Sequence, residues 1–172
     1  MPIYALDGRI PSIDPEAFVH PDAVIIGAVT IGPESTIWPC AVLRADGGPI
    51  TVGARTSVQD GAVIHVTEAH PTIIGDDCVI GHQVHMEGCT IENSVLVGSG
   101  SKVLERAVVR SGALVGANAV VRAGMEVPSR AMALGVPASL RLDAVNPALI
   151  AAGAAIYVAR GHEYRAQLRR ID

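Results

Sequence analysis

Aromatic residues are scarce in this chain of 172 residues, since Phe, Trp and Tyr together make up 3 %. Hydrophobic residues nevertheless make up 49 %. Val, Ile, Leu and Ala must therefore fill the interior, which predicts a narrow aliphatic core. No stretch approaches the ~18 consecutive apolar residues of a membrane-spanning helix, and the N-terminus lacks the charged-then-apolar order of an export signal. We expect a cytoplasmic protein with no membrane partner.

Cysteine and basic residues are also few. Cys40, Cys78 and Cys89 form an odd set without CxxC spacing, which argues against a disulfide framework or a thiolate zinc site. We expect them to be small buried residues. The formal net charge is −4, and no basic run occurs outside the last dozen residues. This charge pattern excludes nucleic acid as the expected partner.

The chain contains a six-residue repeat of aliphatic residues. Helical stripes recur at about 3.6 residues and half-buried strands at two, so neither ordinary pattern explains this spacing. The repeating positions, in four runs, are Val19, Ile25, Ile31, Ile37 and Leu43; Val52, Val58 and Ile64; Ile74, Ile80 and Met86; and Ile91, Val97, Val103, Val109, Val115, Val121 and Val127. Glycine or another small residue often follows, which suits a turn after each short strand.

A period of six predicts a solenoid of very short parallel strands, each contributing one aliphatic residue to the interior. Stacking the coils at about 4.8 Å joins these residues into continuous columns. The pattern resembles the hexapeptide-repeat proteins, and this resemblance implies an all-β solenoid: a left-handed parallel β-helix of about six three-strand coils. We expect a single domain over residues 1–172, with the β-helix at about residues 10–138.

A C-terminal α-helix is predicted at about residues 146–171. Asn146 and Pro147 form a typical helix start. The apolar stripe after them has helical spacing and comprises Ile150, Ala154, Tyr157, Gly161, Tyr164, Leu168 and Ile171. We expect this helix to cover the outside of the coil. The six-residue frame breaks after Leu43, Ile64 and Met86, and we expect loops at the first two breaks.

Stacking three strands per coil brings distant polar residues together. Arg44, His65 and Glu87 each follow a member of one aliphatic column, so they should lie on adjacent coils. An imidazole and a carboxylate at that spacing can share a metal ion. Asp60 and His82 should lie level with each other on a different face. Two subunits around a threefold axis could combine these groups, whereas one narrow prism could not.

Simpler interpretations of these residues remain open. Glu87 beside Arg44 would also be explained by an ion pair between coils, worth under about 1 kcal/mol if exposed. His85 precedes the inward-facing Met86 and is either a substitute metal ligand or a polar edge residue, of which we favour the second.

At these residues the sequence resembles the gamma-class carbonic anhydrase family. The motifs that carry the resemblance are LRAD at 43–46, VQDGAVIHV at 58–66, IGDDCVIGH at 74–82, GCTI at 88–91 and VLVGSGSKV at 95–103. The resemblance implies a homotrimer that hydrates CO2 to bicarbonate at a metal held between subunits. The implied ligands are His65, His82 and the residue five positions after His82, which is Glu87 here instead of histidine. Zinc is the implied metal, with iron and cobalt as alternatives.

The resemblance also implies roles for neighbouring residues. Arg44 and Asp46 would form an ion pair between subunits, and Gln59 and Asp60 would orient the reacting water and contribute a trimer contact. Tyr157 lies in the helix that overhangs the pocket in relatives. The departing proton needs an acceptor, for which Glu68, His70 and His85 are candidates.

Two other functions fit the same residues. A trimer that has lost catalysis could bind a small anion or a metal chelate such as ferripyochelin, and the carboxylate at Glu87 favours this alternative. A CoA-dependent acyltransferase shares the repeat and the GVPA sequence at 135–138. The breaks in the repeat, however, are too short for the long loop that usually carries the catalytic histidine of those enzymes.

Overall fold

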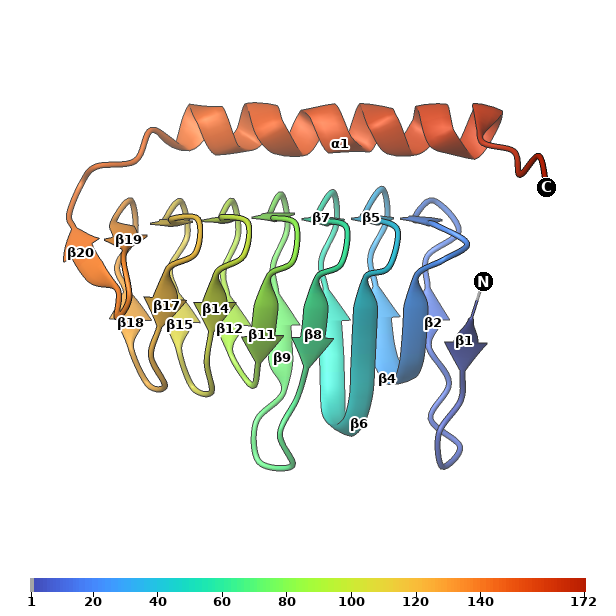
Figure 1. The fold of residues 1–172 in the computed structure, drawn as a ribbon, viewed down its shortest axis with the longest axis horizontal. Coiled ribbons are helices and arrows are strands. Elements are labelled where there is room, and N and C mark those ends of the chain that lie inside the picture. The colour runs from blue at the N-terminus through green and yellow to red at the C-terminus, as the bar shows by residue number, and fades with distance from the viewer. Residues whose placement is uncertain (1) are drawn as a thin grey trace.

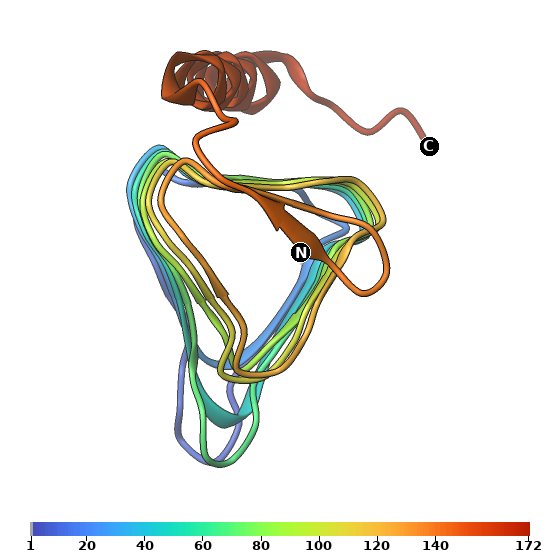
Figure 2. The same ribbon diagram turned by 90° about the vertical axis from the view of Figure 1, so that its left-hand side faces the viewer.

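The structure, a computed structural model that describes residues 2–172, is a β-helix with one α-helix along its side (Figure 1). Seen down the long axis, the coils have a triangular outline (Figure 2). The coil is a left-handed parallel β-helix of about seven turns, which confirms the predicted fold class. The sequence predicts about six coils, one fewer than the structure has. The additional turn begins at Ile3, which pairs with Ile25 although Ile3 lies outside the six-residue period. No helix within residues 2–172 has the length and apolar character to span a membrane.

Two sheets form the three walls of the coil, because the larger sheet bends round one vertex and covers two of them (Figure 2). The twelve-stranded sheet contains β1 (Ile3–Tyr4), β2 (Ser12–Ile13), β4 (Val24–Ile31), β6 (Val42–Val52), β8 (Val63–His65), β9 (Thr72–Ile74), β11 (His85–Glu87), β12 (Thr90–Ile91), β14 (Lys102–Val103), β15 (Val108–Val109), β17 (Val120–Val121) and β18 (Glu126–Val127). The eight-stranded sheet contains β3 (Phe18–Val19), β5 (Thr36–Ile37), β7 (Ser57–Val58), β10 (Val79–Ile80), β13 (Leu96–Val97), β16 (Leu114–Val115), β19 (Met132–Leu134) and β20 (Ser139–Arg141). All pairs are parallel except β19–β20.

The strand register follows the columns that the repeat predicts. Ile25, Leu43, Ile64, Met86, Val103 and Val121 pair in that order. Each of them is fully buried. The aliphatic period therefore fixes which residues face inward and which residues of neighbouring coils lie side by side.

The first break in the repeat is a strand, which corrects the predicted loop. Residues 42–52 form the single strand β6, whose first half pairs with β8 and whose second half pairs with β9. The second break, between β8 and β9, contains the predicted loop, and it lies beside the bend of β6 at one vertex of the triangle (Figures 1 and 2). Three extra residues thus let β6 turn the vertex without losing its pairing.

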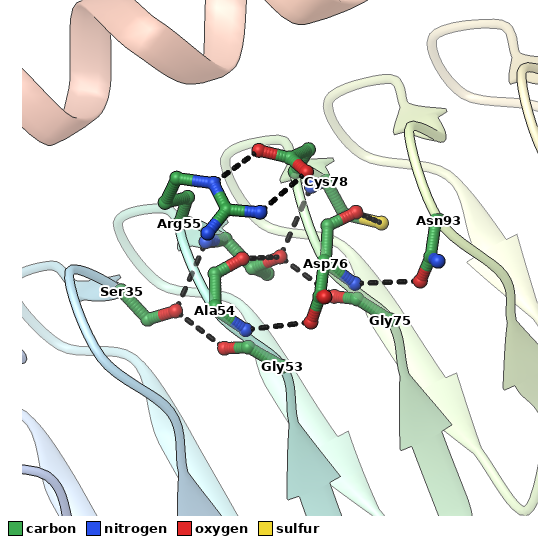
Figure 3. Close-up of polar contacts among 10 residues, drawn as sticks. Ser35, Gly53, Ala54, Arg55, Gly75, Asp76, Cys78 and Asn93 are labelled. Atoms are coloured by element: carbon green, nitrogen blue, oxygen red, sulfur yellow. Dashed lines mark hydrogen bonds and ion pairs between the residues drawn. The ribbon is translucent and has the colours of Figure 1, made fainter.

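Buried hydroxyl and thiol groups tie successive coils together at another vertex (Figure 3). Ser35 donates a hydrogen bond to the carbonyl of Gly53 at 2.6 Å and accepts one from the amide of Thr56. The Thr56 hydroxyl in turn donates to Gly75 O at 2.7 Å and accepts from the amide of Cys78 at 3.0 Å. These side chains satisfy backbone groups that the tight corner leaves without a partner.

Replacing Thr56 with valine should therefore destabilise the fold. The side chain keeps its shape, but a buried carbonyl and a buried amide each lose a partner, and each loss costs about 1–3 kcal/mol. Chemical denaturation should show a lower unfolding free energy for Thr56→Val than for Thr56→Ser, which retains the hydroxyl. Equal stability of the two variants would show that these bonds contribute nothing.

A salt-bridge ladder on the outer surface should make stability depend on pH. Arg110 bonds Glu92 at 2.8 Å and Glu126 at 2.9 Å, and these hydrogen bonds hold the pKa of both carboxyls below the ordinary 4.5. A lowered folded-state pKa stabilises the fold fully above the unfolded pKa, and this contribution is lost as the pH falls through the folded value. Arg110→Gln should flatten the fall in thermal midpoint between about pH 5 and pH 3. Parallel profiles for variant and wild type would contradict this.

The C-terminal helix α1 spans Pro147–Gln167, and the Asn146 side chain caps it by accepting a hydrogen bond from the amide of Ala148. It packs over the eight-stranded sheet along the coil axis (Figure 1). Gly161 allows the close approach, because a Cβ there would lie 2.6 Å from Thr36 Cγ2. The predicted stripe is wrong at its end, since Leu168 and Ile171 lie beyond the helix and are exposed.

Candidate metal centre

Strand pairing places Arg44, His65 and Glu87 on three adjacent coils, as predicted. Arg44 pairs with His65 between β6 and β8, and His65 pairs with Glu87 between β8 and β11. The residue before each of them is buried in the core, so the three side chains project from the outer face of the sheet. The residues that follow this buried aliphatic column by one position thus form a polar row on one outer face of the coil.

The imidazole of His65 lies between two carboxylates. Its Nδ1 is 2.8 Å from Glu87 Oε1 and its Nε2 is 2.9 Å from Asp46 Oδ1. Its side chain is 19 % exposed, and these groups border a surface hollow of about 420 Å³. Both ring nitrogens therefore have oxygen partners within one chain, and this fixes the orientation of the ring.

Asp46 is the residue in this cluster that the sequence did not link to His65. It forms an ion pair with Arg44 within the same chain, whereas the family resemblance implies a pair between subunits. Burial raises the pKa of the Asp46 carboxyl, but hydrogen bonds with His65 and Arg44 outweigh burial and hold this pKa below 3.8. Arg9 donates to the Asp46 carbonyl at 3.0 Å and so fixes the bend of β6. The carboxylate is thus ionised at neutral pH.

His82 and Asp60 lie level with each other at a different corner, again as predicted. His82 Nδ1 is 2.9 Å from Asp60 Oδ2, and both side chains are about half exposed. His82 Nε2 makes no hydrogen bond to any residue in the range 2–172. A half-exposed histidine that a carboxylate holds through one nitrogen, while the other makes no hydrogen bond to the described residues, has the arrangement of a metal ligand with its supporting group.

The remaining predicted site residues lie around these two clusters. His85 projects beside Glu87, with Nε2 3.8 Å from Glu87 Oε2. Glu68 lines the same hollow as His65, whereas His70 pairs with Glu105 at 3.3 Å. Gln59 is 3 % exposed at the corner that carries Asp60. Tyr157 and Asp60 border a second hollow beneath α1.

The donor set of one chain is incomplete for a metal ion. Within residues 2–172, no group of three His, Cys, Asp or Glu side chains is placed to hold one. His65 Nδ1 and Glu87 Oε1 face each other at 2.8 Å and would become two adjacent donors for a divalent transition metal once the metal displaces the proton between them, and His82 lies at another corner of the coil. The residues therefore fit such a metal only if a second chain supplies the third ligand.

Two of the three cysteines lie in the core, away from solvent. Burial raises the pKa of the Cys78 and Cys89 thiols to about 12, so neither is a thiolate at neutral pH. Their burial confirms the expectation from sequence, but that expectation is wrong for Cys40, which is exposed at a corner with φ +60°. The tight corner requires a positive φ at residue 40, and the side chain of a residue at that corner lies on the outer surface and not in the core.

Comparison with known proteins finds curated sequence relatives, among them a plant gamma carbonic anhydrase and a bacterial carnitine operon protein. Gamma carbonic anhydrase 1, mitochondrial, of Arabidopsis thaliana is 38 % identical over 136 residues, covering 76 % of this chain and 50 % of the relative. The carnitine operon protein CaiE of Escherichia coli K12 is 40 % identical over 138 residues, covering 80 % of this chain and 70 % of that protein. The chain thus spans about half the length of the curated gamma carbonic anhydrase. No family model matches the chain.

Solved structures agree with the fold over nearly the whole chain. The crystal structure of a hexapeptide transferase family protein from Anaplasma phagocytophilum superposes with a TM-score of 0.90 at 34 % identity, covering 95 % of this chain and 98 % of that one. The perosamine N-acetyltransferase from Caulobacter crescentus has a TM-score of 0.58 at 21 % identity over 77 % of this chain and 57 % of its own. At that identity the second likeness concerns the fold alone.

Proposed function

Because this chain belongs to the gamma carbonic anhydrase-like family of hexapeptide-repeat proteins, we propose that it hydrates CO2 to bicarbonate at a metal site shared between subunits of a homotrimer. The observation that carries the proposal is the contact between His65 and Glu87 on adjacent coils. The supporting observation is His82, whose exposed imidazole is held through Nδ1 by Asp60. These two half-sites lie on different parts of one chain, and a cyclic trimer brings unlike surface patches together at each interface.

His65 and Glu87 of one subunit and His82 of the next would hold the metal, with zinc as the first choice and iron or cobalt as alternatives. When bound, such a metal lowers the pKa of a coordinated water and so supplies a nucleophile near neutral pH. Glu87 brings a negative charge where an imidazole would be neutral. That charge opposes the lowering of the water's pKa, so the activity should require a higher pH than a three-histidine site would.

The other residues position these groups and remove the proton. Asp60 orients His82, and Arg44 holds Asp46 against His65. Gln59 is nearly buried at the Asp60 corner and is suited to orient the reacting water. The proton leaves through Glu68, which lines the hollow, or through His85, whose Nε2 lies 3.8 Å from Glu87 Oε2.

Stopped-flow measurement of CO2 hydration tests this function. Protein of known zinc, iron or cobalt content should accelerate hydration above the buffer rate, and His82→Ala should abolish the acceleration. A fully metallated trimer no faster than buffer would rule the activity out. Retention of the metal-free protein on immobilised CoA would instead favour the acyltransferase alternative.

Mixed trimers test the sharing of the site. A trimer made only of His65→Ala chains, or only of His82→Ala chains, should lose the metal. Co-refolded together, they should regain roughly one intact site per mixed trimer, because one interface pairs an intact His65 with an intact His82. Absence of regained metal in mixed trimers would place the third ligand within the same chain.

A further inference from the structure

The three walls of the coil differ in what covers their outer faces. Phe18 and Val79 point outward from the eight-stranded sheet, yet they are only 8 % and 6 % exposed. The reason is that α1 packs over β3 and β10 on this wall (Figure 2). Apolar residues on the outer face of this coil are therefore covered by a further element.

A second wall is mostly polar on its outer face. It is formed by β9, β12, β15 and β18 with the second halves of β4 and β6. Arg110 bonds both Glu92 and Glu126 on this wall. The outward residues that pair along it are Thr30, Thr51, Ile73, Thr90, Val108 and Glu126. Such a face is suited to solvent and needs no partner.

The third wall is largely aliphatic on its outer face. It is formed by β8, β11, β14 and β17 with the first halves of β4 and β6, and it carries the row of Arg44, His65 and Glu87. We call it the aliphatic wall after its outward residues, none of which is buried within residues 2–172: Val24, Ile26, Val42, Val63, Leu104 and Val120. A contiguous apolar face that the chain leaves open marks an interaction surface.

The incomplete metal site identifies what covers this wall. His65 and Glu87 lie within it, and no group of three donors able to hold a metal forms there within residues 2–172. His82 follows β10 at a corner of the coil and is half exposed. If a second copy brings its His82 to His65, that corner must lie against β8. Val63 precedes His65 by two residues on β8 and faces the same side, so the corner would cover it.

The charges of the two surfaces agree with this contact. The hollow within the aliphatic wall is acidic, because Glu68 and Glu87 add two carboxylates to the ion pair of Arg44 and Asp46. The hollow beside the opposing corner carries Arg160, whose nearest carboxylate on its own helix lies at 4.0 Å. The carboxylate in that hollow is already held by the corner histidine. An acidic surface would thus meet a basic one.

We propose that the aliphatic wall is the subunit interface, and that the His82 corner of a second copy of this chain covers it. Wall and corner are unlike patches of one chain, so each subunit can give its corner to the next until the ring closes. The inference rests on the proposed shared metal site and names the surface that assembles it. Val63 would be needed for that site although it binds no metal.

Val63 and Ile73 form a matched pair for testing this interface. Both are β-branched residues on the outer face of the same sheet, 38 % and 41 % exposed, but they lie on different walls. Sedimentation of metal-free Val63→Asp should give the mass of one chain, because the contact would bury an unpaired charge. Ile73→Asp should keep the mass of three chains. Circular dichroism should show the same β-structure in both variants.

A milder substitution measures the effect without a buried charge. Val63→Thr keeps the shape of the side chain and should weaken association by roughly tenfold, whereas Ile73→Thr should associate like the wild type. Val63→Asp that remains a trimer, or Ile73→Asp that dissociates equally, would overturn the inference.

The same measurements separate this inference from the proposed activity. A wild-type protein that stays a single chain at every concentration would overturn both the interface and the shared metal site. A metallated wild-type trimer that does not hydrate CO2, but dissociates on Val63→Asp, would overturn the activity alone and support the interface.

Discussion

Glu87→Ala is expected to lose the bound metal, with affinity falling by more than about tenfold, because the variant removes a charged donor and leaves His65 without its partner across the coils. Elemental analysis of purified protein and competition with a chelating dye would measure the loss. Glu87→His should keep the metal, since an imidazole occupies the same outward position on β11. It should also shift the rise in CO2 hydration to lower pH, because a neutral ligand leaves the full charge on the ion.

Glu105→Ala is the matched control for Glu87→Ala. Glu105 is also a partly exposed carboxylate beside a histidine, since it lies 3.3 Å from His70, but it is outside the row formed by Arg44, His65 and Glu87. Metal content should be unchanged in this variant. If metal content were the same in Glu87→Ala, Glu87→His and wild type, Glu87 would not be a ligand, and the contact with His65 would be a structural ion pair.

The sequence predicts the row of polar residues because the period determines the register. Each side chain in it follows a buried aliphatic residue by one position, and a one-residue slip would turn every aliphatic residue outward. That penalty recurs on every coil, so the pairing of His65 with Glu87 was predictable even though 22 residues separate them.

The partners of His65 were less predictable where the repeat breaks. Asp46 lies in the bend of β6, and no aliphatic column passes through those residues to fix where the side chain goes. The bend depends on tertiary contacts, including the hydrogen bond from Arg9, 37 residues away. Sequence periodicity gives no information about such a contact, so only the ion pair with Arg44 was expected, and from family resemblance.

The ends of the coil were hard to predict for a similar reason. The first turn uses Ile3 and Tyr4, whose spacing to Ile25 and Ile26 is not a multiple of six along a regular coil. At the other terminus, the apolar stripe of the helix continues to Ile171 although α1 ends at Gln167. Beyond that residue the chain has left the surface that the stripe would cover, so apolar spacing alone overestimates the length of the helix.

Two adjacent isoleucines of β9 provide the largest expected contrast in stability. Ile74 is 1 % exposed and pairs with Val52 and Ile91 in an interior column, whereas Ile73 is 41 % exposed on the outer face. Ile74→Ala removes the same atoms as Ile73→Ala but leaves a cavity that close-packed neighbours cannot fill, so it should cost about 2–5 kcal/mol. Ile73→Ala should cost less than about 1 kcal/mol.

Denaturation in guanidinium chloride at one fixed protein concentration would measure both variants, since subunit association would make the midpoint depend on concentration. Ile74→Val should fall between Ile74→Ala and wild type, at about 0.5–1.5 kcal/mol, because one methyl group is lost. If Ile73→Ala were as destabilising as Ile74→Ala, the outer face of β9 would itself be buried, and a subunit interface there would be the physical cause. In a solenoid each coil contacts only its neighbours, so the loss at Ile74 should appear first as opening of the coils that carry His65 and Glu87.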